Sequence, residues 1–171
     1  TSATDSNNVA VGYFAGKSVT TGISNTLIGG LAGDALTDAD YNIAIGRDTL
    51  GTDTKGNKSV AIGSFALKDQ NFTTSTDSYN VAVGYDAGRT LTTGVQNTYV
   101  GGAAGIHALT NNYTTFLGTN AGYGTSGSEL TGHFNTSLGY ESGFKLITSA
   151  TKNTFVGTYA GYFNGTDSTA N

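Results

Sequence analysis

The stretch NVAVGYFAG, residues 8–16, is followed along the chain by eight variants of itself. The copies begin at residues 25, 42, 59, 80, 97, 114, 135 and 153, and the first three read NTLIGGLAG, NIAIGRDTL and SVAIGSFAL. Self-similarity at a fixed short period is typical of solenoids, in which one repeat cannot bury its apolar face alone and must stack on its neighbours. We therefore expect each copy to form one coil of a continuous stack.

Every copy has a glycine at its fifth position. These central glycines are Gly12, Gly29, Gly46, Gly63, Gly84, Gly101, Gly118, Gly139 and Gly157, which are 17 residues apart in most coils, 18 in one and 21 in two. Glycine permits positive φ and a close approach of another backbone, so we expect a corner directly after each strand. The repeats predict a single domain over residues 1–171 that is all-β, a parallel β-solenoid of about nine coils with 17–21 residues each.

The four residues before each glycine predict a short strand. The residue directly before the glycine is always aliphatic, and the residue two places before that is always β-branched. This alternation with period two is typical of a strand with one buried face. We expect the aliphatic residue to form the structural core, namely Val11, Ile28, Ile45, Ile62, Val83, Val100, Leu117, Leu138 and Val156. The residue between the two varies widely in size. We expect this variable residue to point outward, so that Leu27, Tyr99, Phe116 and Phe155 pack between identical rolls around a threefold axis.

Two further positions of the repeat suggest how the coils close. Asn begins seven of the nine copies, and stacked amides can form a ladder that also satisfies the backbone groups of the turns. The third residue after the glycine is always Ala, Thr or Ser. We expect this small residue to lie in a second strand that packs close to the first.

Composition excludes several classes of protein. Charged residues make up 12% of the chain, the net charge is −4, and the eight Lys and Arg residues form no run, which argues against nucleic-acid binding. The absence of cysteine excludes disulfides and thiolate metal sites. No apolar stretch reaches the roughly 20 residues of a membrane-spanning helix, so we expect no membrane insertion by this segment.

Several copies resemble known repeats. NNVAVG, YNIAIG, KSVAIG and YNVAVG are similar to the NSVAIG repeats in the head domains of trimeric autotransporter adhesins, and NTSLGYESG and NTFVGTYAG resemble the NTAIGYNAG arrays of phage tail-fibre and bacterial surface-fibre proteins. The resemblance implies a left-handed β-roll assembled as a homotrimer, with a rigid spacer or head that binds a surface and carries no catalytic residues. The adhesin repeats are shorter than the coils of this chain, so longer loops are expected here.

The polar residues offer weak candidates for chemistry. Asp34, Asp38 and Asp40, together with the turn at Asp53, have carboxylates of the kind that bind hard cations, although a solvated turn is the simpler interpretation. His107 and His133 lie in no metal-binding motif and are interpreted as loop residues. We therefore expect no catalytic residues, no metal, no cofactor and no enzymatic activity.

Ligand-binding candidates lie on the corners and in the longer coils. Tyr13, Tyr85 and Tyr140 directly follow central glycines, where their rings either stack on sugars or pack against neighbouring coils or subunits. The two 21-residue coils must carry extra loops over about residues 68–78 and 123–133, and insertions in solenoids often carry binding sites.

These patterns predict a structural and adhesive module of an extracellular fibre, a cell-surface appendage or a phage tail fibre. Its expected partners are copies of itself, as a homotrimer or an end-to-end filament, and a glycan or a surface protein. The alternative is an ice-binding solenoid with a ladder of Thr26, Thr98, Thr115, Thr136 and Thr154, although the Val and Ile residues in the same column suit a core better. A polysaccharide lyase or hydrolase would require clustered charges on one face.

Overall fold

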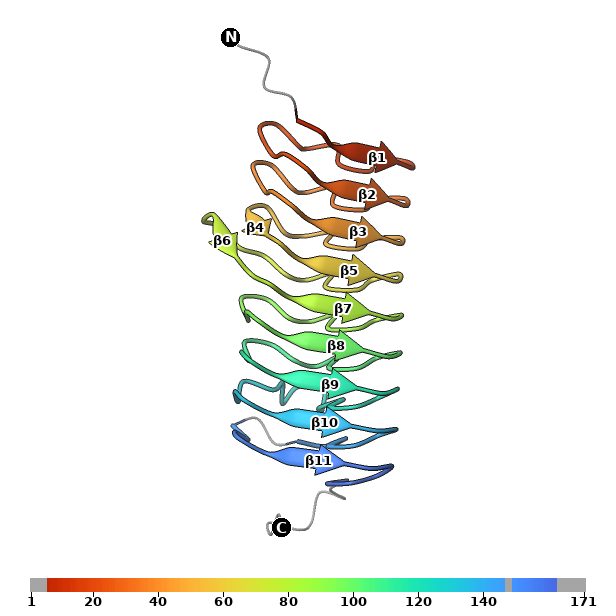
Figure 1. The fold of residues 1–171 in the computed structure, drawn as a ribbon, viewed down its shortest axis with the longest axis vertical. Helices are drawn as coiled ribbons and strands as arrows, with labels where there is room; N and C mark the ends of the chain where they lie inside the picture. Colours follow the sequence, from red (N-terminus) through yellow and green to blue (C-terminus); the bar gives the residue numbers. More distant parts are fainter. Residues whose placement is uncertain (1–5, 147–148, 163–171) are drawn as a thin grey trace.

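A computed structural model describes residues 6–146 and 149–162 and shows a straight stack of nine coils (Figure 1). Each coil contributes one three-residue strand to a parallel sheet in the order β1-β2-β3-β5-β7-β8-β9-β10-β11. The strands are β1 (Val9–Val11), β2 (Thr26–Ile28), β3 (Ile43–Ile45), β5 (Val60–Ile62), β7 (Val81–Val83), β8 (Thr98–Val100), β9 (Thr115–Leu117), β10 (Thr136–Leu138) and β11 (Thr154–Val156). The all-β parallel solenoid predicted from the repeats is confirmed.

Equivalent positions of the repeat lie directly above one another. In β7 and β8, for example, Val81 pairs with Thr98 and Val83 with Val100, and the same register holds between all nine strands. The central glycines have φ between 123° and 141°. A Cβ on Gly101 would lie 2.5 Å from the carbonyl carbon and oxygen of Gly118 one coil further on. The predicted corner is therefore confirmed, with both positive φ and close backbone contact.

The inward face of the strands is opposite to the predicted one. The middle residue of each strand points into the solenoid, and Leu27, Tyr99 and Phe116 are completely buried. The column predicted as core points outward instead: Val11, Ile28, Leu117, Leu138 and Val156 are exposed, and Ile45, Ile62, Val83 and Val100 are half-buried. Alternation with period two defines two faces and does not say which is inside, so the more uniformly apolar face was the wrong choice.

In six of the nine coils the middle residue and the residue six places later compensate in size, whereas both are small in the first, fifth and eighth coils. Where it is large, the residue six places later is glycine, as in Phe116 with Gly122, whose added Cβ would collide with the Phe116 ring. Where it is the alanine of β3 or β5, that later position holds the buried side chain of Leu50 or Leu67. Close packing of the interior therefore depends on two positions that vary together.

The segment after each corner forms turns, and the predicted second strand is absent from the described coils. The second and fourth residues after the glycine have left-handed backbone conformations, as in Phe14 (φ 55°) and Gly16 (φ 60°). Two left-handed residues so close together cannot continue an extended strand. The small residue between them, such as Ala32 or Ala104, is nevertheless buried against the strand.

Ser137 is a polar exception among the middle residues of the main strands, which point into the solenoid. It is fully buried in β10, and its hydroxyl has no hydrogen-bond partner among the described residues. We expect Ser137→Ala to raise the free energy of unfolding by about 1–2 kcal/mol, because the unpaired hydroxyl is removed. Chemical denaturation followed by circular dichroism measures this change. The control is Ser142→Ala, which removes a hydroxyl that donates to the Gly139 carbonyl at 3.1 Å, and it should not stabilise the protein. Equal effects of the two substitutions would contradict the prediction.

Candidate functional site

Asparagines form a ladder at the position before the strand in seven of the nine coils, with Ser59 and Thr114 at this position in the other two. The Asn97 Oδ1 accepts a hydrogen bond from the Thr114 backbone N–H of the next coil at 3.1 Å, and its Nδ2 donates to the Asn111 carbonyl of its own coil at 2.8 Å. Asn25, Asn42 and Asn80 make equivalent contacts. Each amide thus closes one coil and joins it to the next, and the predicted amide ladder is confirmed.

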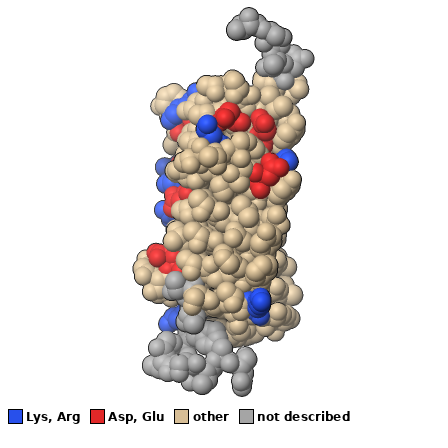
Figure 2. Space-filling model, turned by 90° about the vertical axis from the view of Figure 1, so that its left-hand side faces the viewer, with Lys and Arg blue, Asp and Glu red and all other residues tan. Residues whose placement is uncertain are grey.

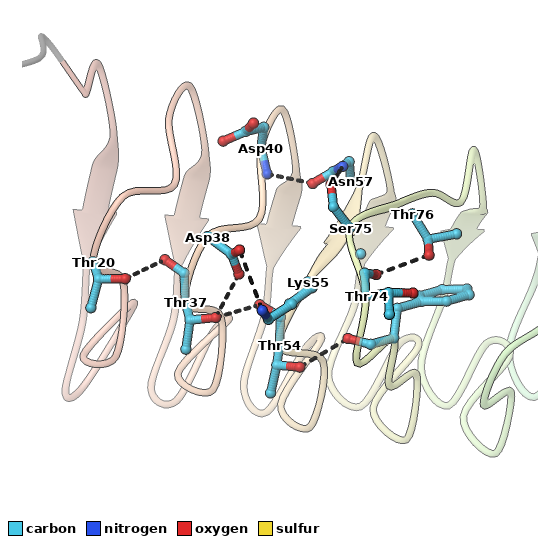
Figure 3. A network of polar contacts seen from close by, with 12 residues as sticks. Thr20, Thr37, Asp38, Asp40, Thr54, Lys55, Asn57, Thr74, Ser75 and Thr76 are labelled. Carbon is cyan, nitrogen blue, oxygen red and sulfur yellow. Dashed lines mark hydrogen bonds and ion pairs between the residues drawn. The ribbon is translucent and has the colours of Figure 1, made fainter.

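A second ladder lies in the return loops and includes two residues that were weighed as functional candidates. The Ile23 backbone N–H donates to Asp40 Oδ1 at 2.8 Å, and the Asp40 N–H donates to Asn57 Oδ1 at 2.8 Å (Figure 3). Further along, the Asn112 N–H donates to His133 Nδ1 at 3.0 Å. Asp40 and His133 therefore connect coils, a role that the sequence did not indicate because three different residue types share the column.

The acidic loop of residues 34–40 does not converge on a common point. Asp34 pairs with Lys17 at 2.8 Å, and Asp38 pairs with Lys55 at 3.5 Å (Figure 3). The hydrogen bond from Thr37 lowers the pKa of Asp38. No group of three or more His, Cys, Asp or Glu residues able to hold a metal ion is found in the described part of the chain. These carboxylates act as separate partners for neighbouring coils.

Asp53 is buried, which corrects its interpretation as a solvated turn residue. Its carboxylate accepts hydrogen bonds from Gln70 Nε2 at 2.6 Å and from the backbone N–H groups of Phe72 at 3.0 Å and Gly56 at 3.1 Å. Gln70 and Phe72 belong to the first long loop, which pairs β6 (Thr76–Asp77) with β4 (Gly56–Asn57). Asp53 therefore anchors this loop to the preceding coil.

The second long loop and His107 are also integrated into the stack. Leu130 forms a parallel bridge with Ala108, and Thr125 bridges Ser128 within the loop. His107 stands edge-on to Tyr123 with ring centroids 5.2 Å apart. Partial burial lowers the pKa of His107, which favours the neutral ring. Both long loops expose Ser and Thr residues at their tips while their bases are fixed by backbone contacts.

The three candidate tyrosines are exposed but lie far from one another. Their exposed fractions are 72% for Tyr13, 60% for Tyr85 and 44% for Tyr140, and they belong to the first, fifth and eighth coils. Each contacts a neighbouring ring of its own chain: Tyr13 contacts Phe14, Tyr85 contacts Phe65, and Tyr140 contacts Tyr159. A hydrogen bond with Glu141 raises the pKa of Tyr140 to about 12. The structure therefore does not bring these tyrosines together into one site.

The most prominent surface is one that the sequence interpretation placed inside. The first and third residues of the nine main strands form an outward strip without a single charged side chain, which we call the outer strip. All sixteen exposed large hydrophobic residues of the described chain lie on this strip or at the corners that flank it. Charged side chains gather elsewhere, with the basic ones mainly along one edge in Figure 2. The outer strip is therefore free of charge, and its flanking corners carry exposed rings as well as Arg47 and Lys58.

No family model matches this sequence, and neither curated proteins nor solved structures gave a match. The described residues include no helix of the length and apolarity that a membrane crossing requires.

Proposed function

We propose that this chain is a structural and adhesive rod of an extracellular fibre, a cell-surface appendage or a phage tail fibre, and that it associates side by side with copies of itself as a homotrimer. The observation that carries this proposal is the outer strip with its flanking corners. Soluble monomers rarely expose large contiguous apolar patches, and such patches usually mark interfaces. Aromatic enrichment and lack of charge are typical of interface cores.

The geometry of the strip suits a lateral interface between long rods. At about 4.8 Å for each coil, the nine strands form a strip roughly 40 Å long. Three such strips facing a common axis cover one another and close a ring, which prevents unlimited growth. In this proposal the chain is not an enzyme, and its buried asparagines at the position before the strands join neighbouring coils. Adhesion to a glycan or surface protein is assigned to the exposed Ser and Thr residues of the long loops.

The test is the mass of the assembly in solution. We expect the purified protein to be a trimer by light scattering, and Ile62→Lys to shift it at least tenfold in concentration toward the monomer, because a lysine would be buried without a partner. Thr52→Lys is the matched control, since Thr52 is exposed in the return loop of a neighbouring coil and away from the strip. Circular dichroism verifies that both variants remain folded. A wild-type monomer at high micromolar concentration would refute the proposal.

Ice binding is a second candidate, because the threonine column lies on the outer strip and not in the core. Thr98, Thr115, Thr136 and Thr154 are paired in register along consecutive strands, which gives a regular array of hydroxyl and methyl groups. This removes the objection that the Val and Ile residues of the column need burial. A thermal-hysteresis assay separates the candidates: the rod should show none, whereas an ice-binding protein should lose its activity on Thr115→Lys.

A further inference from the structure

Two rows of residues flank the outer strip, one at each end of the strands that Figure 1 draws as arrows. The leading edge is the row of residues that lie two places before each main strand, directly before the position of the asparagine ladder. In the third to eighth coils these residues are Tyr41, Lys58, Tyr79, Gln96, Tyr113 and Phe134. The trailing edge is the residue just after each central glycine, and in the same coils it holds Arg47, Ser64, Tyr85, Gly102, Thr119 and Tyr140. The two edges carry different residues, so they define a direction across the strip.

The leading edge presents its large side chains under a backbone constraint. Tyr41, Tyr79, Tyr113 and Phe134 have φ between 48° and 61°, a left-handed conformation that disfavours bulky residues. Their exposed fractions nevertheless lie between 48% and 53%. Glycine or asparagine would fit this backbone more easily. Within the chain Tyr113 stacks on Phe134 with ring centroids 5.1 Å apart and Lys58 lies over the Tyr79 ring, so these side chains form a row along the edge that remains about half exposed.

Parallel rods around a common axis bring unlike edges together. Rotation about an axis along the rods places the leading edge of one chain against the trailing edge of the next. With no vertical shift, Tyr79 meets Tyr85 and Phe134 meets Tyr140 as aromatic pairs. Tyr41 meets Arg47, which is a cation–π pair. The lysine of the leading edge in the fourth coil meets Ser64, so no like charges face each other in these six coils.

Vertically shifted copies would form an open helical assembly instead of a closed trimer, and their contacts also fit less well. A shift of one coil in one direction places Lys58 against Arg47, two like charges, and removes all three aromatic contacts. A shift in the opposite direction places Tyr79 against Gly102 and Tyr41 against Ser64. That arrangement exchanges the three contacts for two others, Lys58 with Tyr85 and Tyr113 with Tyr140. The aligned arrangement therefore has the most favourable contacts and no repulsive one.

We propose that neighbouring copies of this chain pack parallel and in register, with Tyr79 of one copy against Tyr85 of the next, Phe134 against Tyr140 and Tyr41 against Arg47. This inference rests on the proposed lateral self-association and specifies its direction and alignment. It assigns the exposed tyrosines of the corners to a seam between copies, which is the subunit-packing alternative for Tyr85 and Tyr140.

The absence of cysteine makes the seam directly testable. The double variant Tyr79→Cys/Tyr85→Cys places one thiol on each edge. Within one chain these positions are separated by the strand, roughly 10 Å or more, which is beyond the reach of a disulfide. Oxidation with copper–phenanthroline should therefore link different copies. We expect more than half of the chains in covalent trimers on a non-reducing gel, with little product from the single variants.

The controls distinguish the alignments and separate this inference from the proposed function. Tyr79→Cys/Gly102→Cys and Tyr79→Cys/Ser64→Cys report a shift of one coil in either direction, and each should give at most a tenth of the aligned product. A higher yield from either shifted pair would overturn the alignment. Intact trimers by light scattering with no linked product from any pair would overturn the seam but keep self-association. A monomer would overturn both.

Discussion

Gly101→Ala is expected to disrupt the stack at its centre, whereas Gly102→Ala, one residue later, leaves it intact. The Gly101 backbone has φ of 132°, and an added Cβ would lie 2.5 Å from backbone atoms of Gly118, which cannot move away without breaking the register of β8 and β9. Strain and steric overlap together should cost more than about 4 kcal/mol, which is exceptional for a single substitution. Urea denaturation followed by circular dichroism gives the free energy of unfolding.

Gly102 provides a control within the same corner. The nearest heavy atom to its added Cβ is the Thr119 Cγ2 at 3.9 Å, an ordinary contact. Gly102→Ala should change the free energy of unfolding by no more than about 0.5–1 kcal/mol, and a small gain is expected because alanine restricts the unfolded chain. If both substitutions destabilise the protein equally, the close approach of neighbouring corners is not what requires glycine.

The second large effect concerns the asparagine ladder. Asn97→Leu keeps a side chain of similar size but leaves the Thr114 N–H and the Asn111 carbonyl without their partner in a buried environment. We expect a loss of about 2–4 kcal/mol in the free energy of unfolding, since two buried polar groups lose their hydrogen bonds. The exposed neighbour Gln96 provides the control, and Gln96→Leu should have little effect on the stability of an isolated chain.

Substitution of Asn97 by aspartate tests whether the side-chain amide of this residue donates hydrogen bonds in the ladder. Asn97→Asp retains an acceptor for the Thr114 N–H but points its second oxygen at the Asn111 carbonyl and the Asn80 Oδ1. Burial and these two oxygens should raise the pKa of the new carboxyl, because they favour its protonated form. The folded state then binds the proton more tightly than the unfolded chain, so this variant should gain stability as the pH falls. A pH-independent stability would show that the amide does not donate there.

The repeat made the parallel architecture predictable, but it did not reveal which face of the strands points into the interior. The central glycines, the nine strands and the role of Asn at the ladder position all follow from spacing and residue type. The choice of inner face failed because the outer strip is more uniformly aliphatic than the interior. The correct signal was the joint variation of the middle residue with the position six places later, as in Ala44 with Leu50 and Phe116 with Gly122.

The roles of Asp53 and His133 in joining coils could not be predicted for a different reason. Asp53 and His133 are typical loop residues by composition, and a neighbouring coil supplies the Phe72 N–H that binds Asp53 and the Asn112 N–H that binds His133. Such partners are 19 and 21 residues away and depend on the course of the long loops. By contrast, the exposure of Tyr13, Tyr85 and Tyr140 follows from their place beside a corner glycine, and only their separation along the rod required coordinates.

The identical bonding between successive coils has a consequence for how such a protein changes length. Because the strands and corners repeat the same backbone hydrogen bonds from coil to coil, insertion or loss of one complete 17-residue repeat away from the long loops preserves the strand pairing at the new junction. A gain of a few residues within a repeat can only bulge outward, as in the two long loops. Unequal recombination in the gene can therefore lengthen or shorten the rod in fixed increments of about 4.8 Å without redesign of its interior.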